Sequence, residues 1–153
     1  MRLTNYTDYS LRVLIYLAVN KQKPLVTIQE IADAYHISKN HLMKVVHQLG
    51  KMGYLENIRG RNGGLKLAKL PVDINIGEIV RQTEDDFHMV ECFDPKKNAC
   101  ALAPACTLKG VLKQATQAYL NVLYGFTLED LVHNSDSLME LLNQHSHKVG
   151  DGS

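Results

Sequence analysis

Residues 27–52 have the sequence TIQEIADAYHISKNHLMKVVHQLGKM, which predicts two short helices joined by a tight turn. The first helix opens with a capping box, because Thr27 precedes Glu30 by three residues. The second helix follows Ser38, a residue favoured at the N-cap, and extends to about Met52. Its inward positions are aliphatic and its outward positions are polar or basic. This arrangement is typical of a helix-turn-helix, whose second helix enters the major groove of DNA.

Residues 53–68 follow directly with the sequence GYLENIRGRNGGLKLA, which predicts a β-hairpin. Apolar and polar residues alternate on both sides of a turn-rich tip, RGRNGG at residues 59–64. A hairpin placed after a helix-turn-helix indicates a wing. We therefore expect a mainly α fold with a small β-hairpin, in which a winged helix-turn-helix domain occupies residues 1–83.

The charge distribution supports a nucleic-acid partner for this domain. The net charge of the chain is +1, but residues 1–70 hold eleven Lys or Arg against four Asp or Glu, a net charge of +7. Residues 71–153 hold six against twelve, a net charge of −6. The residues expected to contact DNA are Ser38, Lys39, Asn40, His41 and Lys44 on the second helix, and Arg59, Arg61 and Asn62 at the hairpin tip. Any one of them could be ordinary solvated surface, but their order and charge together favour double-stranded DNA.

The flanking helices complete the expected domain. Apolar residues at helical spacing predict a helix from Tyr9 to Asn20, capped by Thr7 or Asp8. Another short helix is predicted at residues 74–83. From residue 84 to residue 106 no periodicity is sustained, which predicts a loop long enough to need a functional reason.

All three cysteines of the chain, Cys92, Cys100 and Cys106, fall in this loop. Their spacing, C-x₇-C-x₅-C, lacks the closely spaced pairs that zinc sites prefer. Three thiolates on a long loop suit a larger group such as an iron–sulfur cluster, whose fourth ligand would be a carboxylate, a histidine, water or an exogenous thiol. The alternative is three buried free cysteines, which the surrounding charged residues disfavour. Spacing alone therefore predicts metal binding and leaves the kind of metal open.

A long amphipathic helix is predicted from residue 107, within a C-terminal segment that ends near residue 142. Its apolar stripe consists of Leu108, Val111, Leu112, Ala115, Tyr119, Val122 and Phe126. Residues 143–153 are polar and are expected to form a disordered tail. No apolar run is long enough for a membrane span and the first residues do not form a signal peptide, so we expect a cytoplasmic protein without a membrane partner. No catalytic motif is recognisable, so we expect no enzyme.

Four stretches carry a resemblance to a known family. They are LTNYTDYSLR at residues 3–12, NHLMK at 40–44, RGRNGG at 59–64 and CALAPAC at 100–106. Over residues 1–142 the chain resembles the winged-helix iron–sulfur transcription regulators, and most closely their nitric-oxide-sensitive repressors. The resemblance implies a homodimer joined by the long C-terminal helix, with the stripe from Leu108 to Val122 at the dimer interface.

The resemblance also implies a cofactor and a signal. The three cysteines would hold an iron–sulfur cluster, with [4Fe-4S] as first choice and [2Fe-2S] as second. Nitrosylation by nitric oxide would release the repressor from palindromic, A·T-rich operators of nitric-oxide detoxification or nitrate and nitrite metabolism genes. Asp8 of the partner subunit is the expected fourth ligand, and its ordinary role would be a helix N-cap. Arg12, four residues after Asp8, is expected to pair with it and to couple the cluster to the DNA-binding domain.

Two other interpretations remain open at this stage. The chain could be a sensor of iron–sulfur supply, in which cluster occupancy sets the DNA affinity. It could also be a DNA-binding protein whose metal is only structural. The second alternative predicts that metal removal unfolds the protein, whereas sensing predicts a folded apoprotein with altered DNA affinity.

Overall fold

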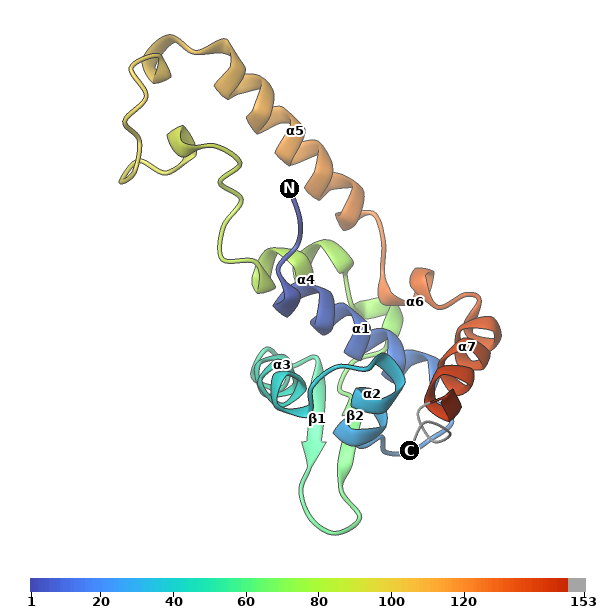
Figure 1. Cartoon of the computed structure of the whole chain (residues 1–153). Coiled ribbons are helices and arrows are strands. Elements are labelled where there is room, and N and C mark those ends of the chain that lie inside the picture. The colour runs from blue at the N-terminus through green and yellow to red at the C-terminus, as the bar shows by residue number, and fades with distance from the viewer. Residues whose placement is uncertain (149–153) are drawn as a thin grey trace.

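A computed structural model of the chain describes residues 1–148, and residues 149–153 lie outside that part (Figure 1). The described chain is mainly helical with a two-stranded antiparallel hairpin, which confirms the expected fold class. The helices are α1 (Asn5–Val19), α2 (Ile28–Tyr35), α3 (Lys39–Lys51), α4 (Ile76–Thr83), α5 (Thr107–Tyr124), α6 (Leu128–Leu131) and α7 (Ser135–Lys148). The strands are β1 (Leu55–Ile58) and β2 (Gly64–Leu67), and single 3₁₀ turns are η1 (Pro71–Asp73), η2 (Glu91–Phe93) and η3 (Ala103–Ala105).

The helix-turn-helix forms where the capping residues predict it. Thr27 and Glu30 make the reciprocal capping box at the start of α2. His36 ends α2 in the left-handed region, with φ of 54°, and turns the chain toward α3. Ser38 occupies the N-cap of α3, although its side chain makes no capping hydrogen bond there. The hydroxyl is therefore not committed to the helix terminus.

The hairpin is attached to the helices by a short third segment. β1 and β2 pair in the register Leu55 with Leu67 and Ile58 with Gly64. Val26, just before α2, bridges Leu65 through two backbone hydrogen bonds of 2.7 and 3.0 Å. A Cβ at Gly64 would lie 2.9 Å from the Val26 carbonyl oxygen, so this close approach requires glycine. The wing is thereby fixed to the segment before α2 at its base, while its tip extends into solvent (Figure 1).

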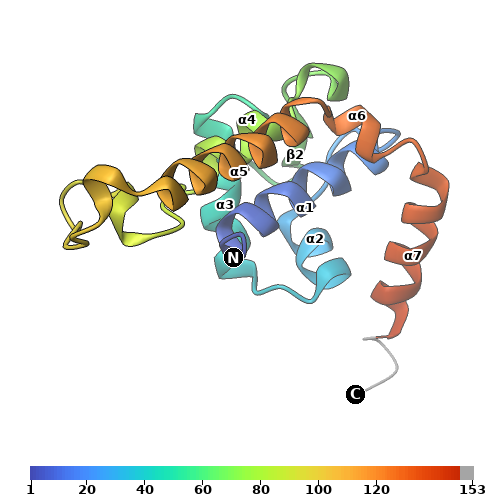
Figure 2. The same cartoon turned by 90° about the horizontal axis from the view of Figure 1, so that it is seen from above.

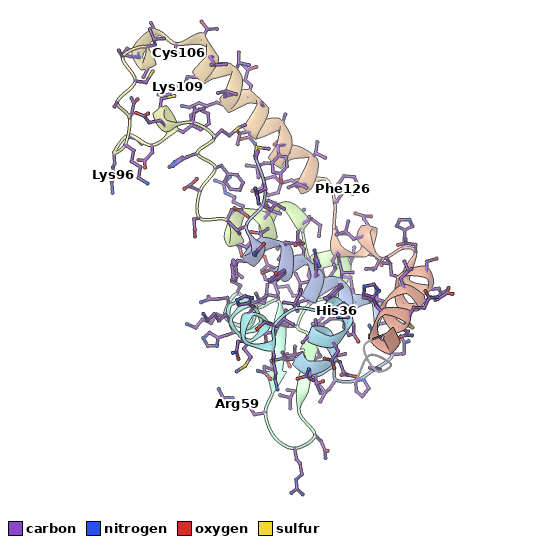
Figure 3. All side chains as sticks on the ribbon, viewed as in Figure 1. His36, Arg59, Lys96, Cys106, Lys109 and Phe126 are labelled. Atoms are coloured by element: carbon purple, nitrogen blue, oxygen red, sulfur yellow. The ribbon has the colours of Figure 1, made fainter. Side chains whose placement is uncertain are left out.

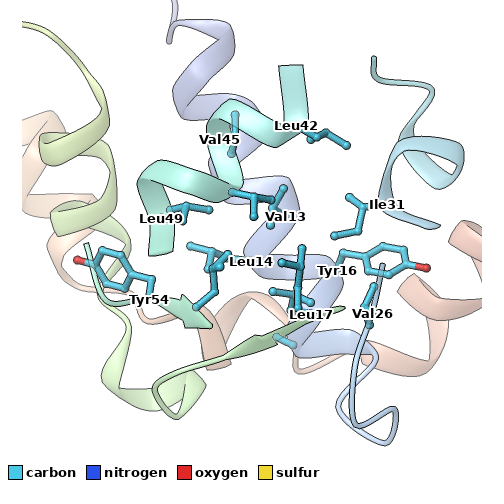
Figure 4. Close-up of a cluster of buried hydrophobic side chains, with 14 of the residues drawn as sticks. Val13, Leu14, Tyr16, Leu17, Val26, Ile31, Leu42, Val45, Leu49 and Tyr54 are labelled. Carbon is cyan, nitrogen blue, oxygen red and sulfur yellow. The ribbon is translucent and has the colours of Figure 1, made fainter. Parts of the chain in front are cut away.

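α1 forms the centre of the hydrophobic core (Figure 4). Val13 and Leu14 on α1 are fully buried, as are Ile31 on α2 and Leu42 and Leu49 on α3. The same core takes in Leu55 and Leu65 from the hairpin and Ile79 from α4. We call this assembly, comprising α1–α4, the hairpin, α6 and α7, the winged-helix body. It has a continuous core to which no cysteine contributes.

α5 is anchored to the body at its C-terminal end. Ile76 N donates to the Phe126 carbonyl and Leu128 N to the Ile74 carbonyl, at 3.0 and 2.8 Å. A Cβ at Gly77 of α4 would lie 2.5 Å from the Tyr124 ring and 2.7 Å from the Tyr124 backbone nitrogen. The two helices can meet this closely only because residue 77 has no side chain.

The rest of α5 projects away from the body together with the stretch that precedes it (Figures 1 and 2). We call residues 84–119 the lobe. None of these residues is buried, whereas Thr83 before them and Leu120 after them are. Among the described residues no helix is both long and apolar enough to cross a membrane.

Three expectations about the helices need correction. α1 begins at Asn5, four residues before the predicted start, because Thr4 accepts a hydrogen bond from Thr7 N at 3.3 Å and is the N-cap. Asp8 therefore lies in the first turn and is not a cap. α7 continues to Lys148, so residues 143–148 are helical where a disordered tail was expected; the remainder of that expected tail, 149–153, lies outside the described residues.

Candidate nucleic-acid interface and cysteine loop

α3 presents two different faces. Leu42, Val45, Val46 and Leu49 are buried against the body. All five residues of this segment expected to contact DNA are exposed: Ser38, Lys39, Asn40, His41 and Lys44. Met43 is 50 % exposed on the same helix, an apolar residue that sequence reasoning did not assign. The N-terminal half of α3 can therefore offer hydrogen-bond donors and acceptors to base edges.

The hairpin tip brings further positive charge to solvent. Arg59, Arg61 and Asn62 are all exposed, and Figure 3 shows Arg59 on the hairpin, below the winged-helix body. Gly60 adopts a φ of 114°, which a residue with a Cβ rarely tolerates. Gly63 is equally constrained, because an added Cβ would overlap the Ile58 carbonyl oxygen. The glycines thus set the turn and the arginines project from it, as insertion into a minor groove requires.

The expected pairing of Asp8 with Arg12 is present on α1. Arg12 Nε and Nη2 donate to the two carboxylate oxygens of Asp8, each at 3.0 Å, in a bidentate ion pair. Both side chains are about 40 % exposed, at 42 % and 41 %. The carboxylate is thus held by its own chain and remains accessible from outside.

Tyr35 holds Arg12 from the other side, a contact that sequence reasoning missed. Its hydroxyl donates to the Arg12 carbonyl oxygen at 2.9 Å, and the Arg12 guanidinium lies 5.8 Å from the Tyr35 ring centre. Burial raises the pKa of the Tyr35 phenol above its ordinary value of 10.0. Tyr35 therefore ties α2 to α1 as a neutral hydrogen-bond donor.

Tyr9 connects α1 to the exposed face of α3. Its ring stacks on the His41 ring with 6.4 Å between centroids and 28° between planes. The Arg12 guanidinium lies 6.0 Å from the Tyr9 ring centre. Residues on separate helices meet here, so only the tertiary structure reveals that Tyr9 is next to a predicted DNA contact.

The three cysteines lie in the lobe, far from the hairpin tip that is expected to contact DNA. Cys92 is in η2 and Cys106 is the N-cap of α5, both half-buried, while Cys100 is exposed. Figure 3 shows Cys106 and Arg59 at opposite ends of the molecule. Within residues 1–148 no three His, Cys, Asp or Glu side chains converge as a metal site. The described conformation therefore does not gather the predicted ligands, although three thiols in an irregular segment are the soft donors an iron–sulfur cluster prefers.

The predicted dimerisation stripe is largely exposed on α5. Leu108, Val111 and Val122 are 60 %, 53 % and 62 % exposed. Ala115 is exposed as well, and Leu112 and Tyr119 are half-buried. A single helix face with this much uncovered apolar surface is typical of a protein–protein contact.

A capped helix-turn-helix, a basic exposed recognition face and an arginine-tipped wing define a DNA-binding transcription regulator, and the comparisons with known proteins agree. The family model described as "Rrf2: Iron-dependent Transcriptional regulator" matches residues 3–134. The chain belongs to the Rrf2 family of iron-dependent transcriptional regulators. A transcriptional regulator is not an enzyme, in agreement with the expectation from the sequence.

Curated relatives agree with this family, and a solved structure shows a similar fold. The chain is 60 % identical to the HTH-type transcriptional regulator NsrR of Bacillus licheniformis, over 94 % of this chain and 100 % of that protein. It is also 60 % identical to the NsrR of Bacillus subtilis, over 93 % and 97 %. The fold is similar to that of T. potens IscR, with a TM-score of 0.70, 23 % identity and coverage of 88 % of each chain.

Proposed function

We propose that the chain is a cytoplasmic homodimeric repressor that holds an iron–sulfur cluster and releases palindromic, A·T-rich operator DNA on exposure to nitric oxide. When bound, such a cluster supplies an iron centre that reacts with nitric oxide. The nitric-oxide signal comes from the motif resemblance, and the relatives named NsrR support it. The target genes would be those of nitric-oxide detoxification or nitrate and nitrite metabolism.

The observation that carries this proposal is the lobe. A stretch from residue 84 to residue 119 without one buried residue cannot be held by its own hydrophobic burial. Other interactions must hold this stretch in place, and its residues offer two kinds. Three cysteine thiolates can tie the irregular part to a cluster of the [4Fe-4S] type, with [2Fe-2S] as the alternative. The apolar stripe of α5 can be covered by the same stripe of a second copy.

Within this proposal each part of the chain has a separate task. Residues 1–83 bind DNA, residues 84–106 carry the ligands Cys92, Cys100 and Cys106, and residues 107–142 form the dimer. Asp8 lies in the first turn of α1, which belongs to the body, whereas the cysteines of its own chain lie in the lobe. We therefore assign it as a ligand in trans, as Asp8 of the partner subunit. Arg12 would then hold Asp8 whenever the carboxylate is not a ligand.

The direct test is to purify the protein without oxygen and to record its visible absorption. Its affinity for a DNA site, selected on the protein itself from a randomised library, is then measured before and after stoichiometric nitric oxide. We expect a cluster spectrum that changes on addition of nitric oxide, together with a loss of DNA affinity of at least tenfold, about 1.4 kcal/mol.

Two variants sharpen this test. Cys100→Ala should lack the cluster spectrum and the nitric-oxide response, yet unfold thermally like apoprotein of the wild type, because no cysteine belongs to the body core. Leu102→Ala, a 72 % exposed neighbour in the same loop, should behave as wild type. DNA affinity that follows cluster loading but ignores nitric oxide would instead identify a sensor of iron–sulfur supply. An apoprotein that is unfolded would indicate a structural metal.

A further inference from the structure

Glu84 joins the lobe to the start of α1. It is the C-cap of α4 and the first residue of the lobe. Its Oε1 accepts hydrogen bonds from Thr4 N at 2.8 Å and from Thr4 Oγ1 at 3.0 Å. Thr4 and Glu84 are 80 residues apart in the sequence. Their contact therefore joins the start of α1 to the end of α4, which only the fold brings together.

Thr4 is the residue through which such a contact acts on α1. Its Oγ1 donates to Glu84 and accepts from Thr7 N at 3.3 Å, while its carbonyl accepts from Asp8 N at 3.0 Å. A carboxylate at this position also interacts favourably with the positive end of the helix dipole. Glu84 therefore stabilises the capped geometry of the first turn of α1.

The arm that precedes α1 lies beside the lobe. Leu3, Glu84, Phe87 and Tyr119 line one cavity of about 620 Å³. The N-terminal residues thus lie between the beginning of the lobe and the middle of α5. A displacement of the lobe would reach Thr4 through Glu84 and would also reshape the cavity beside Leu3.

The first turn of α1 leads directly to the recognition helix. Tyr9 follows Asp8 in α1 and stacks on His41 of α3, with 6.4 Å between ring centroids. A change in the position of the first turn moves the Tyr9 ring, and the His41 ring rests on it. The route from Glu84 to His41 therefore consists of two contacts, Glu84 with Thr4 and Tyr9 with His41, joined by the backbone of the first turn of α1.

We propose that Glu84 is a positioning residue that couples the cysteine loop to the recognition helix within one subunit, through Thr4 and Tyr9. The inference rests on the proposed function for the role of the loop. It does not require a ligand from the partner subunit, because every contact in the route is made inside one chain. It predicts that part of the coupling survives when Asp8 is removed.

The test compares Glu84→Ala and Glu84→Gln with a neighbouring control. Asp85→Ala removes the same charge one residue away, and Asp85 makes no hydrogen bond or ion pair among the described residues. For each protein, the dissociation constant for the library-selected DNA site is measured with and without the cluster. Hydrogen–deuterium exchange of the amides of residues 7–9 and 39–42 is followed in parallel, without DNA.

We define the coupling ratio as the dissociation constant without the cluster divided by the one with it. Glu84→Ala should keep its cluster spectrum but reduce this ratio by about fivefold. Exchange at residues 7–9 should rise by a similar factor. Glu84→Gln, whose amide oxygen can accept both hydrogen bonds, should restore most of the ratio, and Asp85→Ala should match wild type. The Asp8→Ala variant should keep a ratio above one. Adding Glu84→Ala to that variant should bring the ratio to one.

The inference is overturned if Glu84→Ala retains the wild-type ratio and exchange pattern, or if Asp85→Ala changes them equally. Failure of the proposed function has a different signature, since wild-type protein would then show no cluster spectrum. In that case the exchange measurement still decides, because unchanged exchange at residues 7–9 and 39–42 in Glu84→Ala would refute the contact route by itself.

Discussion

The winged-helix body and the lobe are built on opposite principles. In the body, aliphatic side chains from α1, α3 and the hairpin close one core, with Val13, Leu14 and Leu42 at 0 % exposure. In the lobe no residue is buried, and Leu108 and Val111 are more than half exposed. The body carries its own stability, whereas the lobe offers surfaces and thiols that require something else to cover or bind them.

This difference indicates where a signal can act. A segment with little buried apolar surface opens at low free-energy cost, whereas a closed core resists small perturbations. A change at the cysteines therefore alters the lobe first. It reaches the body through the Glu84–Thr4 contact, the cavity lined by Leu3, Phe87 and Tyr119, and the C-terminal end of α5, where Tyr124 packs on Gly77.

The largest expected effect contrasts two leucines on helices. Leu42→Ala should lower the free energy of unfolding by about 2–5 kcal/mol, because the side chain is fully buried and the body cannot collapse around the cavity. Leu108→Ala should change the stability of a single chain by no more than about 0.5 kcal/mol, because the side chain is 60 % exposed. Denaturant unfolding at low protein concentration measures both.

Protein concentration separates the two variants further. If α5 is a dimer contact, the Leu108→Ala deficit should grow with protein concentration, since association adds to apparent stability. The Leu42→Ala deficit should be similar at every concentration. A large concentration-independent loss in Leu108→Ala would mean that the lobe has a core of its own, and the contrast between the regions would be wrong.

A smaller effect is expected at the joint between the regions. Gly77→Ala should cost about 1–3 kcal/mol, although alanine favours helices, because the added Cβ meets the Tyr124 backbone nitrogen at 2.7 Å. Gly110→Ala is the matched control on α5, where nothing lies within 4 Å of the added Cβ. It should be neutral or stabilising by about 0.5–1 kcal/mol. Thermal unfolding of both variants gives the comparison, and equal stability of the two would remove the evidence for a tight joint.

Sequence reasoning recovered local features well and tertiary contacts poorly. The capping box at Thr27, the alternating wing and the pairing of Asp8 with Arg12 depend on residues within a few positions of each other, and all three are present. The start of α1 was predicted too late, because Thr7 or Asp8 was expected to cap the helix and the actual N-cap is Thr4, three residues before Thr7. Besides accepting from Thr7 N, Thr4 contacts Glu84, a partner that local propensity does not predict.

In the candidate site too, features set by local sequence were predicted and features set by tertiary contacts were not. The exposed face of α3 follows from helical spacing, so its residues were identified correctly as surface. Tyr9, Tyr35 and Glu84 were missed because their partners lie on other helices or at the far end of the domain. The functional assignments of the DNA contacts, the cysteines and the α5 stripe remain predictions, and the Cys100→Ala and Leu108→Ala variants test the last two.

The smallest expected effect concerns Tyr35 and pH. Burial raises the pKa of its phenol, so the folded body keeps the proton at a pH where the unfolded chain, with a value near 10.0, has lost it. The stability that the neutral phenol contributes is therefore complete below pH 10 and is lost as the pH rises beyond it. Tyr35→Phe should cost about 0.5–1.5 kcal/mol at neutral pH, because the hydrogen bond to the Arg12 carbonyl is lost.

The same substitution should flatten the alkaline loss of stability without abolishing it, because burial also raises the pKa values of Tyr16 and Tyr54 in the body. Tyr119→Phe on α5 is the lobe control, since the Tyr119 hydroxyl makes no hydrogen bond among the described residues. It should leave the stability at neutral pH unchanged. Denaturant unfolding between pH 8 and pH 11, on the order of the range where phenols titrate, measures these slopes. Equal slopes in Tyr35→Phe and wild type would show that the phenol ionises freely in the folded state, and that α2 is not held to α1 by a buried neutral donor.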